Sequence, residues 1–327
     1  MSLLSVRNLR IELSTRAGVA PVIDDLSFDL AAGEAISFVG ESGCGKSMTA
    51  LGLMGLLPQG IGRIAGGSIT FDGEELTTAS EARLRALRGN DISMIFQEPM
   101  TSLNPVYTVG EQIAEVLREH QNLSRRAAWA MAAELLDAVR IPNASRRVSD
   151  YPFQMSGGQR QRVMIAMALA CKPKILIADE PTTALDVTVQ AQIFDLLRDL
   201  RRDIGSSIIL ITHDMGAVAE MADRVIVMYA GRKAELGPVD TIIERPRHPY
   251  TKGLISCVPH ILSPLTDARA DLTEVPGIVP PLGAFGADAC LFASRCAHVT
   301  DQCTAARPKL QIFGSQHEAE CWHAEEL

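Results

Sequence analysis

The first third of the chain alternates hydrophobic and polar positions with a period of two, which is typical of half-buried β-strands. The alternation covers residues 6–13, 22–30 and 68–72. Residues 34–39 form an apolar strand that enters a glycine-rich turn, and residues 46–57 then have a helical pattern that ends before Pro58. The sequence therefore predicts an antiparallel β-region and a strand–turn–helix unit.

The middle of the chain changes to a helical period and then returns to short apolar runs. Residues 109–139 place their apolar side chains on one helical face, and Ser124 is a predicted N-cap inside this range. Short apolar strands are predicted at residues 175–178, 207–212 and 225–228. A helix at 187–202 separates the first two, which is the pattern of strands buried on both faces of a parallel sheet.

The composition changes after about Glu244. Residues 245–250 read Arg-Pro-Arg-His-Pro-Tyr, residues 275–286 are rich in Pro and Gly, and four of the seven cysteines fall in the last 38 residues. These features predict a separate, loop-rich C-terminal module. We therefore expect two domains, residues 1–244 and 245–327, and no internal repeat that would indicate two tandem copies of one domain.

Composition limits the class of protein. The chain has 327 residues, of which 47% are hydrophobic, and its 31 basic and 39 acidic residues give a net charge of −8, which disfavours nucleic-acid binding through bulk charge. No apolar run is long enough for a membrane span, and no basic segment followed by an apolar run opens the chain. We therefore expect a cytosolic protein whose cysteines are metal ligands or free thiols rather than disulfides.

Residues 40–47 form the clearest chemical motif. They match G-x-x-x-x-G-K-[ST] between a strand and a helix, and they read Gly40, Glu41, Ser42, Gly43, Cys44, Gly45, Lys46 and Ser47. In such a loop the backbone amides surround phosphate oxygens, Lys46 reaches the β- and γ-phosphates, and the Ser47 hydroxyl holds Mg²⁺. The loop and Met48 beyond it are the predicted ATP contacts. A glycine-rich turn that only caps a helix is the disfavoured alternative, because both flanking elements are present.

Two carboxylates end the predicted strand at residues 175–178. Asp179 is expected to order a magnesium ion, and Glu180 to polarise an attacking water molecule. An acidic pair after a strand is by itself ordinary loop chemistry. In a chain that also carries a phosphate-binding loop, the pair indicates a nucleotide hydrolase.

Four further motifs follow in a fixed order. They are Gln97 after a predicted strand, Met155-Ser156-Gly157-Gly158-Gln159 before a helix, Ala184-Leu185-Asp186, and His213 after the strand at 208–212. With the two preceding motifs, this order resembles the Q-loop, signature, D-loop and switch histidine of ATP-binding-cassette (ABC) ATPases. The resemblance implies an α/β fold, a P-loop NTPase ABC cassette with an antiparallel β-subdomain, a helical subdomain at about residues 98–160 and a loop-rich C-terminal extension.

The family resemblance implies a role for each motif. Glu180, His213 and Gln97 form the catalytic set, and Asp179, Ser47 and Gln97 surround the magnesium ion. Two cassettes pack head to tail, so that the signature and D-loop of one contact the ATP bound to the other. The residues implied in this contact with the partner's ATP are Ser156, Gly157, Gly158, Gln159 and Asp186.

The contact with adenine is the least defined part of this predicted site. Many family members stack the base on an aromatic residue upstream of the phosphate loop, whereas residues 1–27 contain no Phe, Tyr, Trp or His. The guanidinium of Arg16, in the loop at 14–21, is the candidate that stacks on the base instead. We therefore expect Arg16 to contribute weakly to ATP binding.

Three longer stretches of sequence resemble one particular group of ABC ATPases. Residues 98–105 (Glu-Pro-Met-Thr-Ser-Leu-Asn-Pro), 178–190 (ADEPTTALDVTVQ) and 247–251 (Arg-His-Pro-Tyr-Thr) closely resemble the ATP-binding subunits of bacterial dipeptide and oligopeptide importers. Such importers combine two different cassettes, two membrane subunits and an external peptide-binding protein, which implies a peripheral position on the cytoplasmic face of the inner membrane. A nickel importer or another solute system of the same branch is an alternative. A non-transport ABC ATPase acting on DNA or ribosomes is disfavoured by the single cassette and the acidic charge.

Four cysteines near the end of the chain form the last candidate site. They are Cys290, Cys296, Cys303 and Cys321, with five, six and seventeen residues between successive members. Four thiolates can hold a [4Fe–4S] cluster or Zn²⁺, although structural zinc usually uses close C-x₂₋₄-C pairs, which are absent here. The peptide-importer resemblance implies a [4Fe–4S] cluster with a structural or regulatory role. Zinc, with His317 or His323 as a further ligand, and four free thiols are the alternatives.

Overall fold

The computed structural model describes residues 2–98, 102–183, 185–257, 274–282, 288–314 and 316–326. The chain divides into two compact units. The helical unit comprises residues 1–3, 30–35 and 78–211, and the P-loop unit comprises residues 4–29, 36–77 and 212–327.

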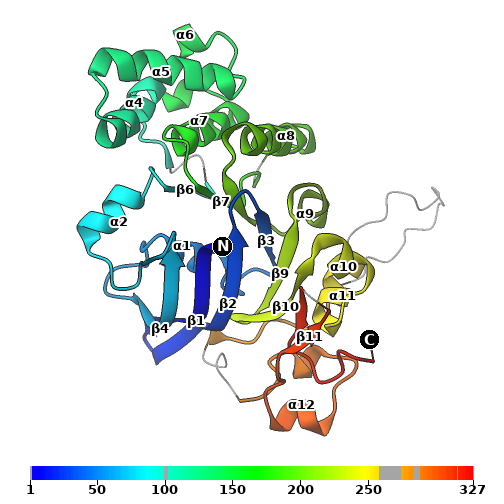
Figure 1. The fold of residues 1–327 in the computed structure, drawn as a ribbon. Helices are drawn as coiled ribbons and strands as arrows, with labels where there is room; N and C mark the ends of the chain where they lie inside the picture. Colours follow the sequence, from blue (N-terminus) through cyan, green and yellow to red (C-terminus); the bar gives the residue numbers. More distant parts are fainter. Residues whose placement is uncertain are drawn as a thin grey trace, which may run out of the picture. The chain divides into compact units, whose positions relative to one another are not determined.

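An antiparallel sheet in the P-loop unit matches the period-two pattern of the first third of the chain (Figure 1). Its strand order is β2-β1-β4-β5, with the strands β1 (Ser2–Thr15), β2 (Gly18–Ala31), β4 (Gly62–Phe71) and β5 (Glu74–Glu75). β1, β2 and β4 are longer than predicted, and β1 has an irregularity in its pairing with β4 between Arg7 and Arg10. Gly67 faces this irregularity at φ 84°, and a Cβ there would lie 2.4 Å from the Asn8 carbonyl oxygen.

The other strands of the P-loop unit have the order β11-β12-β10-β9-β3. Their bounds are β3 (Ala35–Val39), β9 (Arg224–Tyr229), β10 (Arg232–Pro238), β11 (Gln311–Phe313) and β12 (His317–Ala319). β3 and β9 pair in parallel, whereas β10 pairs antiparallel with both β9 and β12. The C-terminal part of the chain, expected to be rich in loops, thus adds two short strands to the sheet of the cassette.

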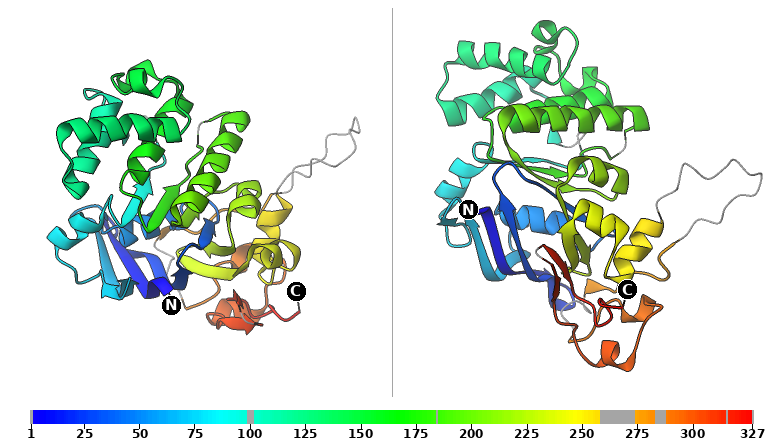
Figure 2. Two further views of the ribbon diagram at one scale, coloured as in Figure 1. Left: turned by 45° about the horizontal axis from the view of Figure 1, so that its top comes forward. Right: turned by 45° about the vertical axis from the view of Figure 1, so that its right-hand side comes forward.

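The helices of the P-loop unit are short. They are α1 (Lys46–Leu53), α9 (Met215–Met221), α10 (Val239–Glu244), α11 (Pro249–Ser256), the 3₁₀ turn η3 (Ala293–Arg295) and α12 (Asp301–Ala305). α1 ends four residues earlier than predicted, because Gly55 takes a left-handed conformation (φ 61°) and the Leu56 amide closes back onto the Leu51 carbonyl at 2.8 Å. The C-terminal strands and α12 are drawn in orange and red in Figure 2.

The helical unit contains three parallel strands and a group of helices. The strands are β6 (Ile92–Ile95), β7 (Ile175–Asp179) and β8 (Ser207–Ile211), and all their residues are buried, as the apolar runs predict. The helical elements are α2 (Glu81–Leu87), α4 (Val109–Gln121), α5 (Arg125–Ala138), α6 (Ala144–Arg147), the 3₁₀ turn η1 (Pro152–Gln154), α7 (Gly157–Leu169) and α8 (Val187–Ile204). The predicted helical stretch at 109–139 is two helices, and Ser124 caps the second by accepting a hydrogen bond from the Ala127 amide.

These elements agree with the α/β cassette fold expected from the sequence. No helix in the described part of the chain is long and apolar enough to cross a membrane.

Candidate active site

The phosphate-binding loop joins β3 to α1 in the P-loop unit, and its glycines are required by the backbone. Gly40 and Gly45 have φ values of 147° and 104°, and a Cβ on Gly40 would lie 2.3 Å from the Met228 carbonyl oxygen. The Lys46 side chain is buried and folds back over the loop, where its ammonium donates to the carbonyl oxygens of Gly40 (2.7 Å) and Glu41 (3.1 Å). A cation is therefore fixed among backbone amides at a helix N-terminus, which is a binding arrangement for phosphate.

The remaining predicted loop residues have different surroundings. Ser42 and Gly43 are exposed, whereas Ser47 and Met48 lie partly buried in the first turn of α1. Cys44 is fully buried 3.6 Å from the Lys46 ammonium, and burial raises the pKa of its thiol. Cys44 is thus a neutral packing residue whose backbone shapes the loop.

The structure brings Gln97 and Glu180 into contact in the helical unit. Glu180 directly follows β7 in a left-handed conformation (φ 45°), an uncommon backbone state for a residue with a side chain. Its Oε2 accepts hydrogen bonds from Gln97 Nε2 (2.7 Å) and Thr183 Oγ1 (2.9 Å), and its amide donates to the Ile211 carbonyl (2.8 Å). Two hydrogen bonds to the carboxylate and one from the backbone amide thus orient Glu180 at the end of a buried strand, as a general base requires.

Two neighbours of Glu180 complete this part of the site. Asp179 is the last residue of β7, and its carboxylate is buried. Thr183 was missed at the sequence level, although its position three residues after Glu180 in the string ADEPTTALDVTVQ was available as a signal.

The signature segment begins α7 in the helical unit. Ser156 caps the helix, since its Oγ accepts from the Gln159 amide (3.3 Å) while Gln159 Oε1 accepts from the Ser156 amide (3.1 Å). Ser156 and Gly157 are exposed, and a Cβ on Gly158 would lie 2.9 Å from Val189 Cγ1. The capped N-terminus of α7 is therefore exposed to solvent.

The D-loop is described from Leu185 onward. Asp186 caps α8, because its carboxylate accepts a hydrogen bond from the Val189 amide at 3.0 Å. Ala184 of the D-loop and Pro99–Thr101 of the string after Gln97 lie outside the described residues.

His213 and Arg16 lie in the P-loop unit. His213 follows β8 and is exposed, and it lines a hollow together with Gly40, Glu41 and Leu254. Arg16 is exposed in the turn between β1 and β2. The predicted residues therefore form two sets, with the phosphate loop, His213 and Arg16 in one unit and Gln97, Asp179, Glu180, the signature and Asp186 in the other.

The Arg-His-Pro-Tyr-Thr string has a structural role that sequence reasoning missed. Glu235, which is fully buried in β10, accepts hydrogen bonds from the amides of Arg247 (2.7 Å) and His248 (3.0 Å) and lies 2.7 Å from His317 Nε2. Burial lowers the pKa of His248 to about 4, so that its ring is neutral and its Nδ1 accepts from the Tyr250 amide (3.1 Å). The string thereby fixes the start of α11 and places Tyr250 in the core.

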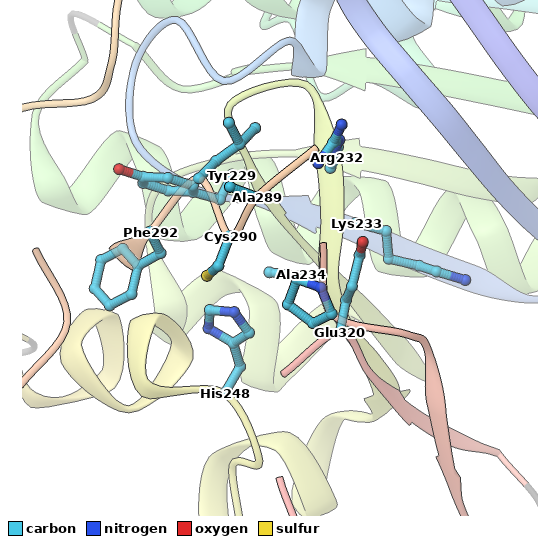
Figure 3. A pocket seen from close by; sticks show the side chains of 11 residues that line it. Tyr229, Arg232, Lys233, Ala234, His248, Ala289, Cys290, Phe292 and Glu320 are labelled. Carbon is cyan, nitrogen blue, oxygen red and sulfur yellow. The ribbon is translucent and has the colours of Figure 1, made fainter. Parts of the chain in front are cut away.

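The four cysteines lie in residues 288–326, the cysteine segment from here on. Burial, with a smaller contribution from the charges of the neighbouring cysteines, raises the pKa of the Cys290 and Cys321 thiols to about 11. The amide of His298 donates to Cys296 Sγ (3.3 Å), and that of His323 donates to Cys321 Sγ (3.4 Å). His323 Nε2 also lies 3.8 Å from Cys303 Sγ. Figure 3 shows Cys290 among Tyr229, Phe292 and His248.

Two family models match the chain. The model described as "ABC transporter" matches residues 23–183, and that described as "Oligopeptide/dipeptide transporter, C-terminal region" matches residues 234–303. A Brucella abortus (strain 2308) protein named for peptide import ATP binding is 51% identical over 319 residues, covering 96% of this chain and 93% of that protein. A Brucella melitensis biotype 1 protein, also named for peptide import ATP binding, is 47% identical over 333 residues, which cover 99% of this chain and 98% of that protein.

Solved structures agree with these matches. The ATP-binding cassette MJ0796, a dimer in a post-hydrolysis state bound to ADP and Pi, has a TM-score of 0.65 at 27% identity and covers 72% of this chain and 98% of its own. A second dimeric structure of the same bacterial ABC transporter cassette has a TM-score of 0.64 at 28% identity, and it also covers 72% of this chain and 98% of its own.

Fold and motifs together define a P-loop ATPase. The chain belongs to the ABC transporter family, as the sequence motifs predicted. It is an ATP-binding and ATP-hydrolysing subunit of that family.

Proposed function

We propose that this subunit energises the import of di- and oligopeptides through separate membrane subunits. The observation that carries the proposal is the match of residues 234–303 to the oligopeptide/dipeptide transporter C-terminal region. Relatives named for peptide import, aligned over nearly the whole chain, support it. The chain would act as a peripheral protein at the cytoplasmic face of the membrane. We place the boundary between the cassette and the C-terminal extension at residues 244 and 245.

We propose roles for the site residues from their contacts. Lys46 and the loop amides would hold the phosphates, and Ser47, Asp179 and Gln97 would hold Mg²⁺. When bound, the ion supplies charge neutralisation at the phosphates. The carboxylate of Glu180 takes a proton from the attacking water, and the contacts from Gln97 and Thr183 keep it oriented for this task.

The remaining residues act at the γ-phosphate and across the dimer. His213 stabilises the γ-phosphate of the ATP bound to its own chain. We propose that the exposed start of α7 contacts ATP held by a second, different cassette. The residues in this contact are Ser156, Gly157, Gly158, Gln159 and Asp186. Amides at a helix N-terminus suit an anionic γ-phosphate.

Exposed apolar side chains on the helical unit support docking of two permease subunits. They lie in the loops before α4 and before α7: Val106, Tyr107, Tyr151 and Phe153. The Val109 amide donates to the Asp150 carbonyl (2.9 Å), which joins the two loops, and the rings of Tyr151 and Phe153 stack with centroids 5.5 Å apart. Contiguous exposed apolar surface is typical of a protein contact. We propose that this permease-docking patch receives the membrane subunits.

We propose that the four cysteines hold a [4Fe–4S] cluster. Within the described residues, no three His, Cys, Asp or Glu side chains are gathered as they would be around a metal ion. This arrangement favours neither zinc nor the cluster, and the resemblance of the four-cysteine tail to that of the peptide importers is what supports the cluster. The other three thiols lie near enough to Cys321 to raise its pKa. Cys296 and Cys321 also accept hydrogen bonds from backbone amides, and such hydrogen bonds to sulfur tune iron–sulfur clusters. A bound cluster would cross-link the cysteine segment.

The test of the transport proposal is uptake into proteoliposomes. The full chain is purified with the membrane subunits that it binds, reconstituted, and supplied with ATP inside the vesicles and with an external binding protein and radiolabelled dipeptide outside. We expect dipeptide uptake that is abolished by Glu180→Gln. Uptake of Ni²⁺ without dipeptide uptake would contradict the peptide assignment, and recovery of ribosomes or DNA in place of membrane subunits would contradict transport.

A further inference from the structure

The second residue of the phosphate loop is held by the cysteine segment. The Glu41 carboxylate accepts two hydrogen bonds from the Arg295 guanidinium, at 2.7 Å from Nη1 and 2.9 Å from Nη2. The Arg295 side chain is only 2% exposed, and the residue directly precedes Cys296. A bidentate ion pair thus joins two parts of the P-loop unit that are 254 positions apart in the sequence.

Arg295 cannot leave this position easily. Its Nε donates to the Pro276 carbonyl (2.6 Å), and its Nη2 donates to the Val275 carbonyl (3.1 Å). Its guanidinium carbon lies 5.7 Å from the ring centroids of both Tyr229 and Phe292, the aromatic pair visible in Figure 3. The Glu41 carboxylate also raises the pKa of Arg295, so the cation persists throughout the physiological pH range.

Tyr250 holds the same loop residue through its backbone. The Glu41 amide donates to Tyr250 Oη at 2.8 Å. The Tyr250 ring is fully buried and packs on Tyr229 and Phe292, with centroids 4.7 and 5.4 Å apart. The backbone and the side chain of Glu41 are therefore both fixed by residues beyond position 245.

The charges of this contact give it a route to nucleotide binding. The Glu41 carboxylate belongs to the loop that surrounds the phosphates, and the Glu41 carbonyl is one of the two backbone oxygens that accept from the Lys46 ammonium. A carboxylate without its cation would repel the phosphates, and it would compete for Lys46. The Arg295 guanidinium neutralises the carboxylate and turns it toward the cysteine segment.

We propose that Arg295 is a positioning residue of the nucleotide site, through which the cysteine segment sets the affinity of the phosphate loop for ATP. The proposal depends only on the ATPase activity of the chain and not on which metal the cysteines hold. The affinity for ATP and the folding of the cysteine segment are then linked, and each stabilises the other.

The experiment is a double-mutant cycle on the full chain, with Kd for MgATP measured by calorimetry in the cold to limit hydrolysis. We expect Arg295→Gln to weaken binding by about tenfold. The double variant Arg295→Gln/Glu41→Gln is expected to bind within about threefold of the unmodified chain, because the repelling carboxylate is gone. Arg307→Gln is the matched control. Arg307 is an arginine of the same segment that pairs with Glu320 and Asp25, so its loss should leave Kd unchanged.

Two results would overturn the proposal. One is an unchanged Kd in Arg295→Gln. The other is a weakened Kd that the second substitution does not recover, since this would mean that Arg295 only stabilises the fold. If Arg295→Gln does not fold, Arg295→Met, which also removes the positive charge, is compared with Arg295→Met/Glu41→Gln in the same way, and equal affinities in that pair would also reject the coupling.

Discussion

The sheets of the cassette and the cysteine segment are stabilised in different ways. β3 and β7 each consist of five consecutive buried residues, and β8 is the same. The cysteine segment has a small buried cluster of its own in which Ala319, Cys321 and Ala324 pack beside Phe313. Its other contacts include ion pairs, such as Arg307 with Glu320 and Glu318 with Lys233.

The two regions therefore obtain their stability from different interactions. Apolar burial contributes about 25 cal/mol per Å² and supports the strands of the cassette without further help. A short segment with few apolar residues needs cross-links, docking onto a larger body, or both. The cysteine segment docks through β12 on β10 and through Arg295 on Glu41. The cluster proposed above would add a cross-link.

The largest expected effect is a loss of ATP turnover in Glu180→Gln, a variant that changes the cassette and leaves the cysteine segment intact. Glu180→Gln keeps the shape of the side chain but removes the base, so we expect ATP turnover to fall by about 10²- to 10⁴-fold. Steady-state phosphate release measures this effect, and calorimetry should show that ATP still binds. Iron content should be unchanged. Near-normal turnover would remove Glu180 from the catalytic role.

The next test changes the cysteine segment and leaves the cassette strands alone. Cys296→Ser is expected to lose nearly all bound iron and the broad visible absorption of an anaerobically purified sample, because a four-thiolate site loses one ligand. Limited proteolysis should then cut within residues 288–326 first. Cys171→Ser, outside the proposed cluster, is the control. Full iron retention in Cys296→Ser would contradict the cluster. One zinc ion per unmodified chain would also contradict it and would assign the cysteines to a zinc site instead.

A matched pair of isoleucines compares apolar burial in the two regions. Ile177 in β7 is fully buried, whereas Ile312 in β11 is 69% exposed. We expect Ile177→Ala to lower the free energy of unfolding by about 2–5 kcal/mol. Ile312→Ala should change it by less than about 0.5 kcal/mol. Denaturant titration measures both, and equal losses would show that the comparison between the regions is wrong.

The smallest effect concerns the permease-docking patch. Phe153→Ala removes an exposed ring, so we expect no change in thermal stability and a weakening of membrane-subunit capture by about threefold to tenfold. Co-purification from detergent-solubilised membranes measures the capture. Val187, an exposed apolar residue elsewhere on the helical unit, provides the control in Val187→Ala. Equal capture by both variants would place the docking surface elsewhere.

Local patterns predicted much of this molecule, but they did not reach its long-range contacts. The phosphate loop, the buried parallel strands and the Ser124 cap were predictable because spacing and periodicity determine them within a few residues. The contact of Gln97 with Glu180 joins positions 83 apart, and family resemblance, rather than spacing, indicated that both belong to one site. The pairing of Arg295 with Glu41 was not predictable, because neither residue has an unusual local sequence. The cysteine spacing likewise did not show which amides donate to the sulfurs.

The pairing of β12 with β10 has a consequence for synthesis of the chain. Glu235 and its partner Ala319 are 84 residues apart, so the outer edge of β10 has no strand beside it while those residues are being translated. At about 5–20 residues per second, this interval lasts roughly 4 to 17 s. An open strand edge is a template for pairing with other nascent chains. During its synthesis the chain therefore passes through a short period in which this strand edge is open to pairing with other chains.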